Sequence, residues 1–140
     1  MAAHLALMGL EVTLYNRTFD HISAISARGG IDLESYEGGP HGFGELAAVT
    51  SDIKKAITGA DMIMVVVPSS AHKDVSALMA PHLQDEQTII LHPGRTCGAI
   101  EVDKVLRDHQ CQAEITVAET GNFYLCQPLR WPGPGAHLPR

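Results

Sequence analysis

Hydrophobic and polar positions change along the chain in blocks that predict helices and strands in turn. Residues 1–8 are rich in Ala and Leu and apolar nearly all round, which predicts a buried helix that ends before Gly9. Residues 11–16 combine β-branched and aromatic side chains, which predicts a short strand. A second helix is expected at 19–28, where the Gly29-Gly30 pair stops it.

The strongest strand signal lies at 62–67, where six consecutive apolar residues precede Pro68. An unbroken apolar run is typical of a strand buried on both faces of a parallel sheet. The other expected elements are weak strands at 31–33 and 46–50 around a glycine-rich loop at 38–44, a helix capped by Thr50 or Ser51 and running to Ile57, a helix capped by Ser69 and Ser70 and running to about Leu83, a strand at 88–91, a helix at 99–108 and a strand at 114–118. Strands that alternate with helices indicate right-handed βαβ units. We therefore predict an α/β fold with a doubly wound, mostly parallel sheet over residues 1–120.

The last 20 residues differ from the rest of the chain. Residues 121–140 hold 4 of the 8 prolines, contain no acidic residue and show no hydrophobic periodicity. This composition predicts an irregular Pro/Gly-rich tail after a single domain.

The composition excludes several classes of protein. The chain has 140 residues, near the size of one domain, and its net charge of −6 argues against a broad surface for nucleic acid or anionic membrane. No segment reaches the ~18 apolar residues that span a membrane. The three cysteines lack a CxxC spacing and the histidines are scattered, so we expect reduced thiols, a cytoplasmic location and no metal site.

Polar residues directly follow the first predicted strand. In a doubly wound sheet ligands bind at the carboxyl ends of the strands, and an acidic residue after the second strand bonds the 2′-hydroxyl of NAD. This chain has the neutral Asn16 there, followed by Arg17 and Thr18. A guanidinium matches the geometry of a phosphate, so we predict a preference for NADP over NAD. A solvated arginine after a strand is the alternative interpretation.

Two further strand ends carry candidate binding residues. Val67, Pro68 and Ser69 lead from a strand into a helix whose free amide groups suit a phosphate or a ribose, although helix capping explains the serine in part. Pro93 and Gly94 follow the next strand, and either close approach of a ligand or a tight turn would explain the glycine.

Two nearby residues receive structural interpretations. His72 is expected in the first turn of a helix, where most histidines are half-exposed. Cys97 is taken as a structural thiol, because no neighbouring motif marks it as a nucleophile.

A dinucleotide-binding fold opens with a strand and a GxGxxG turn whose amide groups hold the pyrophosphate. The sequence has no such turn, so we expect a Rossmann-like sheet that lacks its first strand and glycine-rich turn. The strands at 11–16 and 62–67 then lose the neighbour between them. Each buried backbone group left unpaired costs ~1–3 kcal/mol, which favours pairing of these two strands with each other and loss of the pyrophosphate pocket.

Several motifs together resemble those of the opine (octopine/nopaline) dehydrogenase group, whose dinucleotide folds are like those of glycerol-3-phosphate and 6-phosphogluconate dehydrogenases. The resemblance covers residues 1–120 and rests on the segments 1–12, 16–18, 67–72, 93–101 and 118–120. Cys97 departs from the pattern, which has a glycine there, and the sequence after Thr120 leaves the family; a frame change or an early stop in the coding sequence would explain that ending.

The resemblance implies an NAD(P)H-dependent reductive condensation of an amino acid with a 2-oxo acid, or a related reduction. It also implies a small-molecule substrate and a catalytic histidine in a C-terminal helical domain that this chain lacks. Arg17 and Thr18 would then contact the 2′-phosphate; the segment 67–69 would flank the middle of the cofactor, and Pro93 and Gly94 would approach its nicotinamide side.

Other interpretations remain open at this point. The domain could belong instead to a glycerol-3-phosphate dehydrogenase or a ketopantoate reductase, which share the fold. The fragment alone is expected to be inactive, and a non-catalytic remnant that self-associates through exposed sheet edges is a rival from another class.

Overall fold

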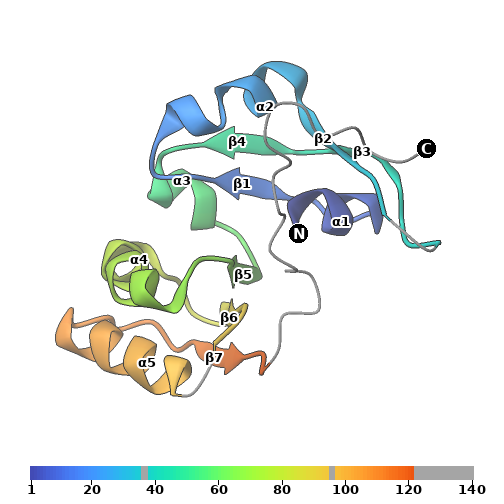
Figure 1. Ribbon diagram of the computed structural model, residues 1–140. Coiled ribbons are helices and arrows are strands. Elements are labelled where there is room, and N and C mark those ends of the chain that lie inside the picture. Colours follow the sequence, from blue (N-terminus) through green and yellow to red (C-terminus); the bar gives the residue numbers. More distant parts are fainter. Residues whose placement is uncertain (36–37, 95–96, 122–140) are drawn as a thin grey trace.

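The computed structural model describes residues 1–35, 38–94 and 97–121, and within them helices alternate with strands (Figure 1). In chain order the elements are α1 (Ala2–Leu7), β1 (Thr13–Tyr15), the 3-10 turn η1 (Phe19–His21), α2 (Ser23–Arg28), β2 (Gly30–Leu33), β3 (Gly42–Glu45), β4 (Ala48–Thr50), α3 (Ile53–Ile57), β5 (Met62–Val65), η2 (Ser69–Ala71), α4 (His72–Met79), η3 (Ala80–His82), β6 (Thr88–Leu91), α5 (Gly98–Asp108) and β7 (Thr116–Glu119). The predicted α/β class is confirmed. The tail expected at 121–140 lies, apart from Gly121, outside the described residues.

The strands of the described residues form three sheets. β5, β6 and β7 make a parallel sheet with β6 in the centre, and β1 pairs in parallel with β4. β2 and β3 form an antiparallel hairpin. In Figure 1, α4 and α5 lie side by side along one face of the β5–β6–β7 sheet. The parallel pairs place the ends of β5, β6 and β7 on one edge, and this edge holds the pocket described below.

β1 and β5 are not hydrogen-bonded to each other, so the expected pairing of these two strands is wrong. The carboxyl end of β1 bonds to β4, because Asn16 N–H donates to the Thr50 carbonyl at 3.2 Å. The carboxyl end of β5 bonds to the end of β6, because His92 N–H donates to the Val65 carbonyl at 2.9 Å. Within the described ranges no strand pairs with the opposite edge of either β1 or β5. Among the described residues no strand joins the two parallel sheets, which agrees with the predicted Rossmann-like sheet that lacks its first strand.

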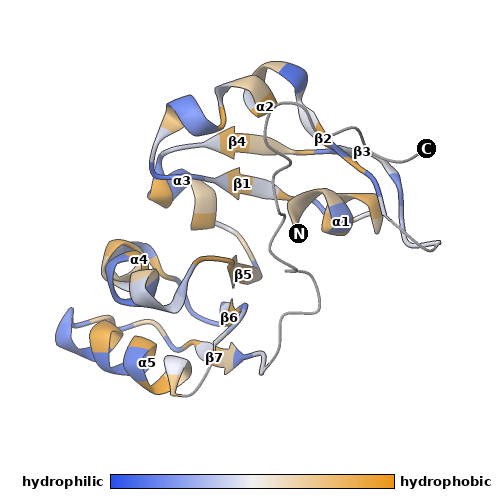
Figure 2. Ribbon diagram, in the orientation of Figure 1, coloured by the Kyte–Doolittle hydropathy of each residue, from blue (hydrophilic) through white to orange (hydrophobic). Residues whose placement is uncertain are grey.

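The hydrophobic core lies between the β5–β6–β7 sheet and the helices that cover it. Ile89 and Leu91 of the central strand are fully buried, as is Val102 of α5. In α5 the buried residues Val102, Val105 and Leu106 follow an i, i+3, i+4 spacing, and Figure 2 shows this helix alternating between hydrophobic and hydrophilic segments. Burying each of these side chains contributes about 1.5–3 kcal/mol, so α5 is held mainly by its apolar stripe.

Two segments expected to be buried are partly exposed. In α1 only Ala3 is buried, and Met8 after it is 66% exposed. In β5 only Val65 is buried, while Met62 is 45% exposed. A strand reaches two-sided burial only with a layer on each face and a strand on each edge. The unpartnered edge of β5 accounts for the difference.

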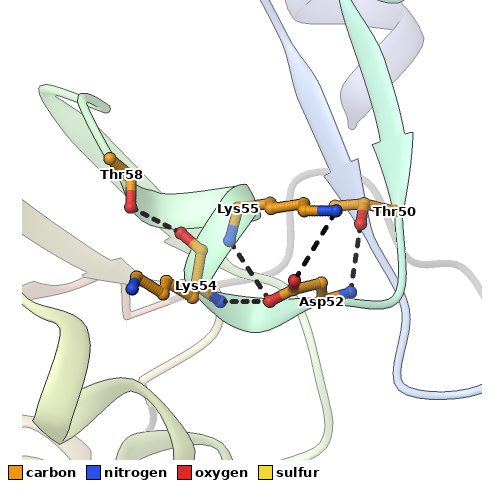
Figure 3. A network of polar contacts seen from close by, with 5 residues as sticks. All are labelled: Thr50, Asp52, Lys54, Lys55 and Thr58. Carbon is orange, nitrogen blue, oxygen red and sulfur yellow. Dashed lines mark hydrogen bonds and ion pairs between the residues drawn. The ribbon is translucent and has the colours of Figure 1, made fainter.

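The cap of α3 is Asp52, not Thr50 or Ser51 as the sequence suggested (Figure 3). The Asp52 carboxylate accepts hydrogen bonds from the N–H groups of Lys54 at 3.0 Å and Lys55 at 3.3 Å. The Thr50 hydroxyl accepts the Asp52 N–H at 3.0 Å, so it bonds to the cap residue and not to the helix. Thr50 ends β4, so Asp52 is the residue whose extended backbone directly precedes the helix.

The glycine-rich loop contains a strand that the sequence did not predict. β3 forms the hairpin with β2, and its Gly44 lies against α1: a Cβ at Gly44 would come within 2.6 Å of the Ala3 carbonyl oxygen. A Cβ at Gly30 of β2 would come within 2.5 Å of the Gly44 carbonyl oxygen. Gly44 lets the hairpin approach α1 closely, and Gly30 lets β2 approach β3. Because glycine has a low strand propensity, the sequence did not indicate β3.

Candidate functional site

A pocket of about 640 Å³ lies at the carboxyl ends of β5 and β6. Its described lining consists of small and polar residues from the two turns that follow these strands and from the first turn of α5: Ser69, Ser70, His72, Gly94, Cys97, Gly98 and Glu101. This is the edge of a parallel sheet where α/β proteins bind ligands.

The turn after β5 supplies the serines. Pro68 is extended and opens the 3-10 turn η2, in which Ala71 N–H donates to the Pro68 carbonyl at 2.8 Å. Ser69 and Ser70 stand exposed in this turn, and neither makes a side-chain cap to η2 or α4. The predicted serine caps are therefore wrong, and both serines line the pocket without a capping role.

The turn after β6 is built around the Glu119 side chain. Glu119 ends β7, and its Oε2 accepts the Ala99 N–H at 2.8 Å, at the start of α5. A carboxylate at a helix N-terminus is favoured by the free N–H groups there. Gly94 N–H donates to the Thr120 carbonyl at 3.1 Å, which brings this turn against the end of β7.

Gly94 and Gly98 are small because the Glu119 side chain lies against both. A Cβ at Gly94 would overlap the Glu119 Cβ, and a Cβ at Gly98 would lie 3.3 Å from Glu119 Oε2. The sequence offered two explanations for Gly94, a ligand or a tight turn. The φ angle of Gly94 is not in the left-handed region, so the turn itself does not require a glycine. The close approach of the Glu119 side chain is a third explanation, and it is sufficient.

His72 is fully buried, in contrast to the half-exposed position expected for it. Within the described part of the chain neither ring nitrogen has a hydrogen-bond partner. Its Nδ1 lies 3.5 Å from the position that a Gly98 Cβ would take, so the ring stands between the starts of α4 and α5. An unpartnered buried polar group is rare in native structures and costs ~1–3 kcal/mol.

Cys97 is exposed and lines the pocket, so it is not the packed structural thiol that the sequence suggested. It is the N-cap residue of α5 and adopts the left-handed conformation, with φ 68° and ψ 16°. This conformation costs a non-glycine residue about 1–2 kcal/mol. The glycine that related sequences were expected to carry there would adopt it without strain.

The three residues after β1 lie outside this pocket. Asn16 Oδ1 accepts the Thr18 N–H at 2.9 Å, which closes a local turn at the carboxyl end of β1. Arg17 and Thr18 are exposed. The Asn16 side chain is used in this local turn, so Arg17 is the residue that brings a charge to the carboxyl end of β1.

Of the eight predicted cofactor-binding residues, the pocket brings together Ser69 and Gly94. Val67 is half-buried and packs against the core, Pro68 is exposed, and Pro93 is buried. These three are not among the residues that line the pocket. The side chain that organises the site, Glu119, was missed because nothing in a strand's sequence shows that its last residue caps a distant helix.

Two other classes of site find no support in the described ranges. No group of three or more His, Cys, Asp or Glu side chains there is placed to hold a metal ion. None of the helices in the same ranges has the length and apolarity needed to cross a membrane.

The sequence profile of one protein family, described as the N-terminus of NAD-dependent glycerol-3-phosphate dehydrogenase, matches residues 1–119. The chain belongs to this family. The glycerol-3-phosphate dehydrogenase N-terminal family is one of NAD-binding domains, so the dinucleotide fold inferred from the strand ends is confirmed. The match ends where β7 ends.

Within this family the chain is similar to opine dehydrogenases, as its motifs suggested. It is 38% identical over 130 residues to the opine dehydrogenase of Arthrobacter sp. (strain 1C), a match that covers 92% of this chain and 35% of the relative. It is 32% identical over 72 residues to the octopine dehydrogenase of Mizuhopecten yessoensis, covering 51% of this chain and 18% of the relative. The chain is thus an N-terminal NAD-binding domain similar to that of opine dehydrogenases, and it spans about a third of the length of the Arthrobacter relative.

Solved structures share the fold. An octopine dehydrogenase determined with NADH and L-arginine matches with a TM-score of 0.67 and 23% identity, over 83% of this chain and 30% of that one. A PanE/ApbA-family ketopantoate reductase from Ralstonia eutropha JMP134 matches with a TM-score of 0.54 and 22% identity, over 84% of this chain and 35% of that one. Both likenesses support the predicted Rossmann-like architecture.

The described residues fit the two ends of a nicotinamide dinucleotide better than its middle. Among the described residues, Ser69 and Ser70 of the pocket make no capping hydrogen bond and the buried His72 has no hydrogen-bond partner. Arg17, at the end of β1, is exposed and is in none of the ion pairs of the same ranges. The glycine-rich turn that would cradle the pyrophosphate is absent from the sequence.

Proposed function

We propose that this chain supplies the dinucleotide-binding part of a longer opine-dehydrogenase-like oxidoreductase, with its nicotinamide end in the pocket after β5 and β6. The pocket carries the proposal, because Ser69 and Gly94 were predicted from separate strand ends and line one cavity. Its volume of about 640 Å³ is in the range of small-molecule sites. Backbone from the segment 67–69 would flank the middle of the cofactor, and Pro93 and Gly94 would flank the nicotinamide.

The adenosine end would lie at the carboxyl end of β1, with a preference for NADP over NAD. Arg17 is exposed, has no carboxylate partner among the described ion pairs, and precedes the hydroxyl of Thr18. Asn16 brings no negative charge that would repel a 2′-phosphate. A guanidinium and a hydroxyl together suit a phosphate monoester.

The reaction proposed for the longer protein is a hydride transfer that reduces the product of an amino acid and a 2-oxo acid. Octopine dehydrogenase structures with NADH have been determined with L-arginine and with pyruvate, which are members of these two classes. The cofactor supplies the hydride when bound. The residues of this chain would orient it and exclude water, while the catalytic residue would lie in the part of the protein that follows β7.

A calorimetric titration of the chain with NADPH and with NADH tests the proposal. Saturable binding of both, tighter for NADPH, supports the domain and the preference. Equal affinities would overturn the NADP preference alone. No heat with either nucleotide at high concentration would favour a non-catalytic remnant; the fragment is expected to lack dehydrogenase activity in either case.

Two alternatives are favoured by particular observations. The glycerol-3-phosphate dehydrogenase [NAD(P)+] of Afipia carboxidovorans is 30% identical over 92 residues, so a domain of that enzyme type is the second candidate within the fold. The unpartnered edges of β1 and β5 would also support self-association, since exposed strand edges pair between chains. Size-exclusion chromatography across a range of concentrations would separate a monomer from an edge-paired dimer. A cytoplasmic location stays a prediction of the cysteine pattern.

A further inference from the structure

The outer edge of β7 carries backbone groups that point away from the sheet. Thr116 and Thr120 donate their N–H groups, each at 3.0 Å, to carbonyls of β6 and of the residue before it. Because successive N–H groups of a strand point to opposite sides, the backbone groups of Val117 and Glu119 face the outer edge. Among the described residues no strand pairs with that edge.

An apolar groove of about 560 Å³ lies between α5 and β7, next to this edge. Its lining is largely apolar, and Ile100 of α5 is 69% exposed there. Asp103 and Arg107 of the lining form an ion pair at 2.9 Å, so their charges offset one another. The groove and the edge together therefore favour an apolar, uncharged segment that also offers backbone hydrogen bonds to β7.

The chain itself continues directly from this edge. Gly121 follows β7, and the 19 residues after it lie outside the described residues. A five-residue segment, 123–127, stands between the turn-forming pair Gly121-Asn122 and Pro128. It consists of Phe123, Tyr124, Leu125, Cys126 and Gln127. Aromatic residues favour strands, a short glycine-containing loop favours a hairpin, and proline ends a ladder, so the segment suits an antiparallel partner of β7.

The charges where β7 begins agree with this antiparallel direction. Glu114 hydrogen-bonds to both Asp85 and Glu86, each at 2.8 Å, so three exposed acidic residues lie together there. An antiparallel segment would carry the chain back to this acidic end. The residues after Gly121 include no acid, and Arg130 follows the segment by three positions. Exposed charges of opposite sign add little affinity, but they favour this orientation over the reverse.

We propose that residues 123–127 form an antiparallel edge strand on β7 and cover the groove between α5 and β7. The irregular tail then begins at Pro128. The added strand pairs with the backbone of Val117 and Glu119, and one face of its side chains enters the groove. It thereby holds the residue whose side chain caps α5 at the Ala99 N–H. This inference does not depend on nucleotide binding.

Hydrogen exchange and NOE contacts of the isotope-labelled full chain test the proposal, because β7 contains its own control. We expect the amides of Val117 and Glu119 to be protected, and NOE contacts to join both residues to the segment 123–127. Thr116 and Thr120 bond toward β6 in either case and supply the control. Free exchange of Val117 and Glu119, or the absence of these NOE contacts, would overturn the proposal.

A chain shortened to end at Gly121 tests which segment provides the protection. We expect Val117 and Glu119 to exchange at least about tenfold faster in it, and Thr116 and Thr120 to change by less than about twofold. Unchanged protection of the first two amides, or protection that rises with chain concentration, would place a second copy of the chain on this edge and would contradict the proposal.

A full-length double variant decides the matter if the shortened chain unfolds. Tyr124→Pro/Leu125→Pro removes at least one N–H that points toward β7, since adjacent residues of a strand alternate. Ala136→Pro/His137→Pro is the matched control, because it adds two prolines outside the proposed strand. We expect only the first variant to free the two outer-edge amides of β7. Equal exchange of these amides in the two variants would refute the pairing.

Discussion

Glu119 Oε2 accepts the Ala99 N–H at 2.8 Å, which joins the last residue of β7 to the first turn of α5. This one carboxylate fixes the wall of the proposed nicotinamide pocket, because Gly94 and Gly98 both lie against the same side chain. The close approach of Gly94 and Gly98 to this one glutamate sets the shape of the site.

Replacing Glu119 by Gln should lower the free energy of unfolding by about 0.5–1.5 kcal/mol. The amide oxygen keeps a hydrogen-bond acceptor but loses the negative charge that the N-terminus of α5 favours. Urea denaturation measures the change. Glu101→Gln is the matched control, since Glu101 lies in the first turn of the same helix but makes no capping bond. Equal losses for the two variants would show that Glu119 does not act as a cap.

A methyl group at Gly94 should destabilise the chain by ~1–3 kcal/mol, because it would overlap the Glu119 Cβ. The double variant Gly94→Ala/Glu119→Gly should recover part of the cost of the Gly94 change, measured as a coupling energy in a double-mutant cycle. Additive losses would mean that Gly94 is small for a reason unrelated to Glu119.

The Asp52 cap should contribute about 0.5–2 kcal/mol, which Asp52→Ala would remove. Its carboxylate accepts two backbone N–H groups of α3, and water replaces these bonds imperfectly. Ser51→Ala is the control, since the neighbouring Ser51 side chain is outside the capping network drawn in Figure 3 and should change stability by less than ~0.5 kcal/mol. Thermal melting of both variants measures the contrast; a larger loss for Ser51→Ala would contradict the cap assignment.

Arg17→Ala should weaken binding of NADPH by ~1–3 kcal/mol and leave NADH nearly unchanged, as expected for loss of a charged hydrogen bond to the 2′-phosphate. Calorimetric titration of both nucleotides gives the two changes. Arg28→Ala is the matched control, because Arg28 is an exposed arginine already paired with Asp32 at 2.6 Å. Equal weakening of both nucleotides by Arg17→Ala would show that Arg17 does not contact the 2′-phosphate.

The sequence predicted the elements that rest on local signals. The apolar run before Pro68 and the strand at 88–91 appear as β5 and β6, and the helix expected at 99–108 appears as α5. These elements form because side-chain periodicity matches the geometry of a single helix or strand. The strand ends that follow them could also be placed, since the carboxyl ends of parallel strands share an edge.

The features that were missed depend on contacts between distant residues. β3 is a strand because glycines let it lie against α1, and Asp52 caps α3 because of where β4 ends. The burial of His72 follows from α5 packing over it, which no local pattern around His72 reveals. The exposure of Met62 likewise reflects the unpartnered edge of β5 rather than its own composition.

The most direct test of the central claim is a titration of the isotope-labelled chain with NADPH, followed by amide chemical shifts in NMR spectra. The account predicts that shifts concentrate at the two ends of the cofactor: Arg17 and Thr18 after β1, and Ser69, Gly94 and Gly98 around the pocket. Shifts confined to the groove between α5 and β7, at Ile100, Arg107 and Ile115, or no shifts at saturating nucleotide, would contradict it.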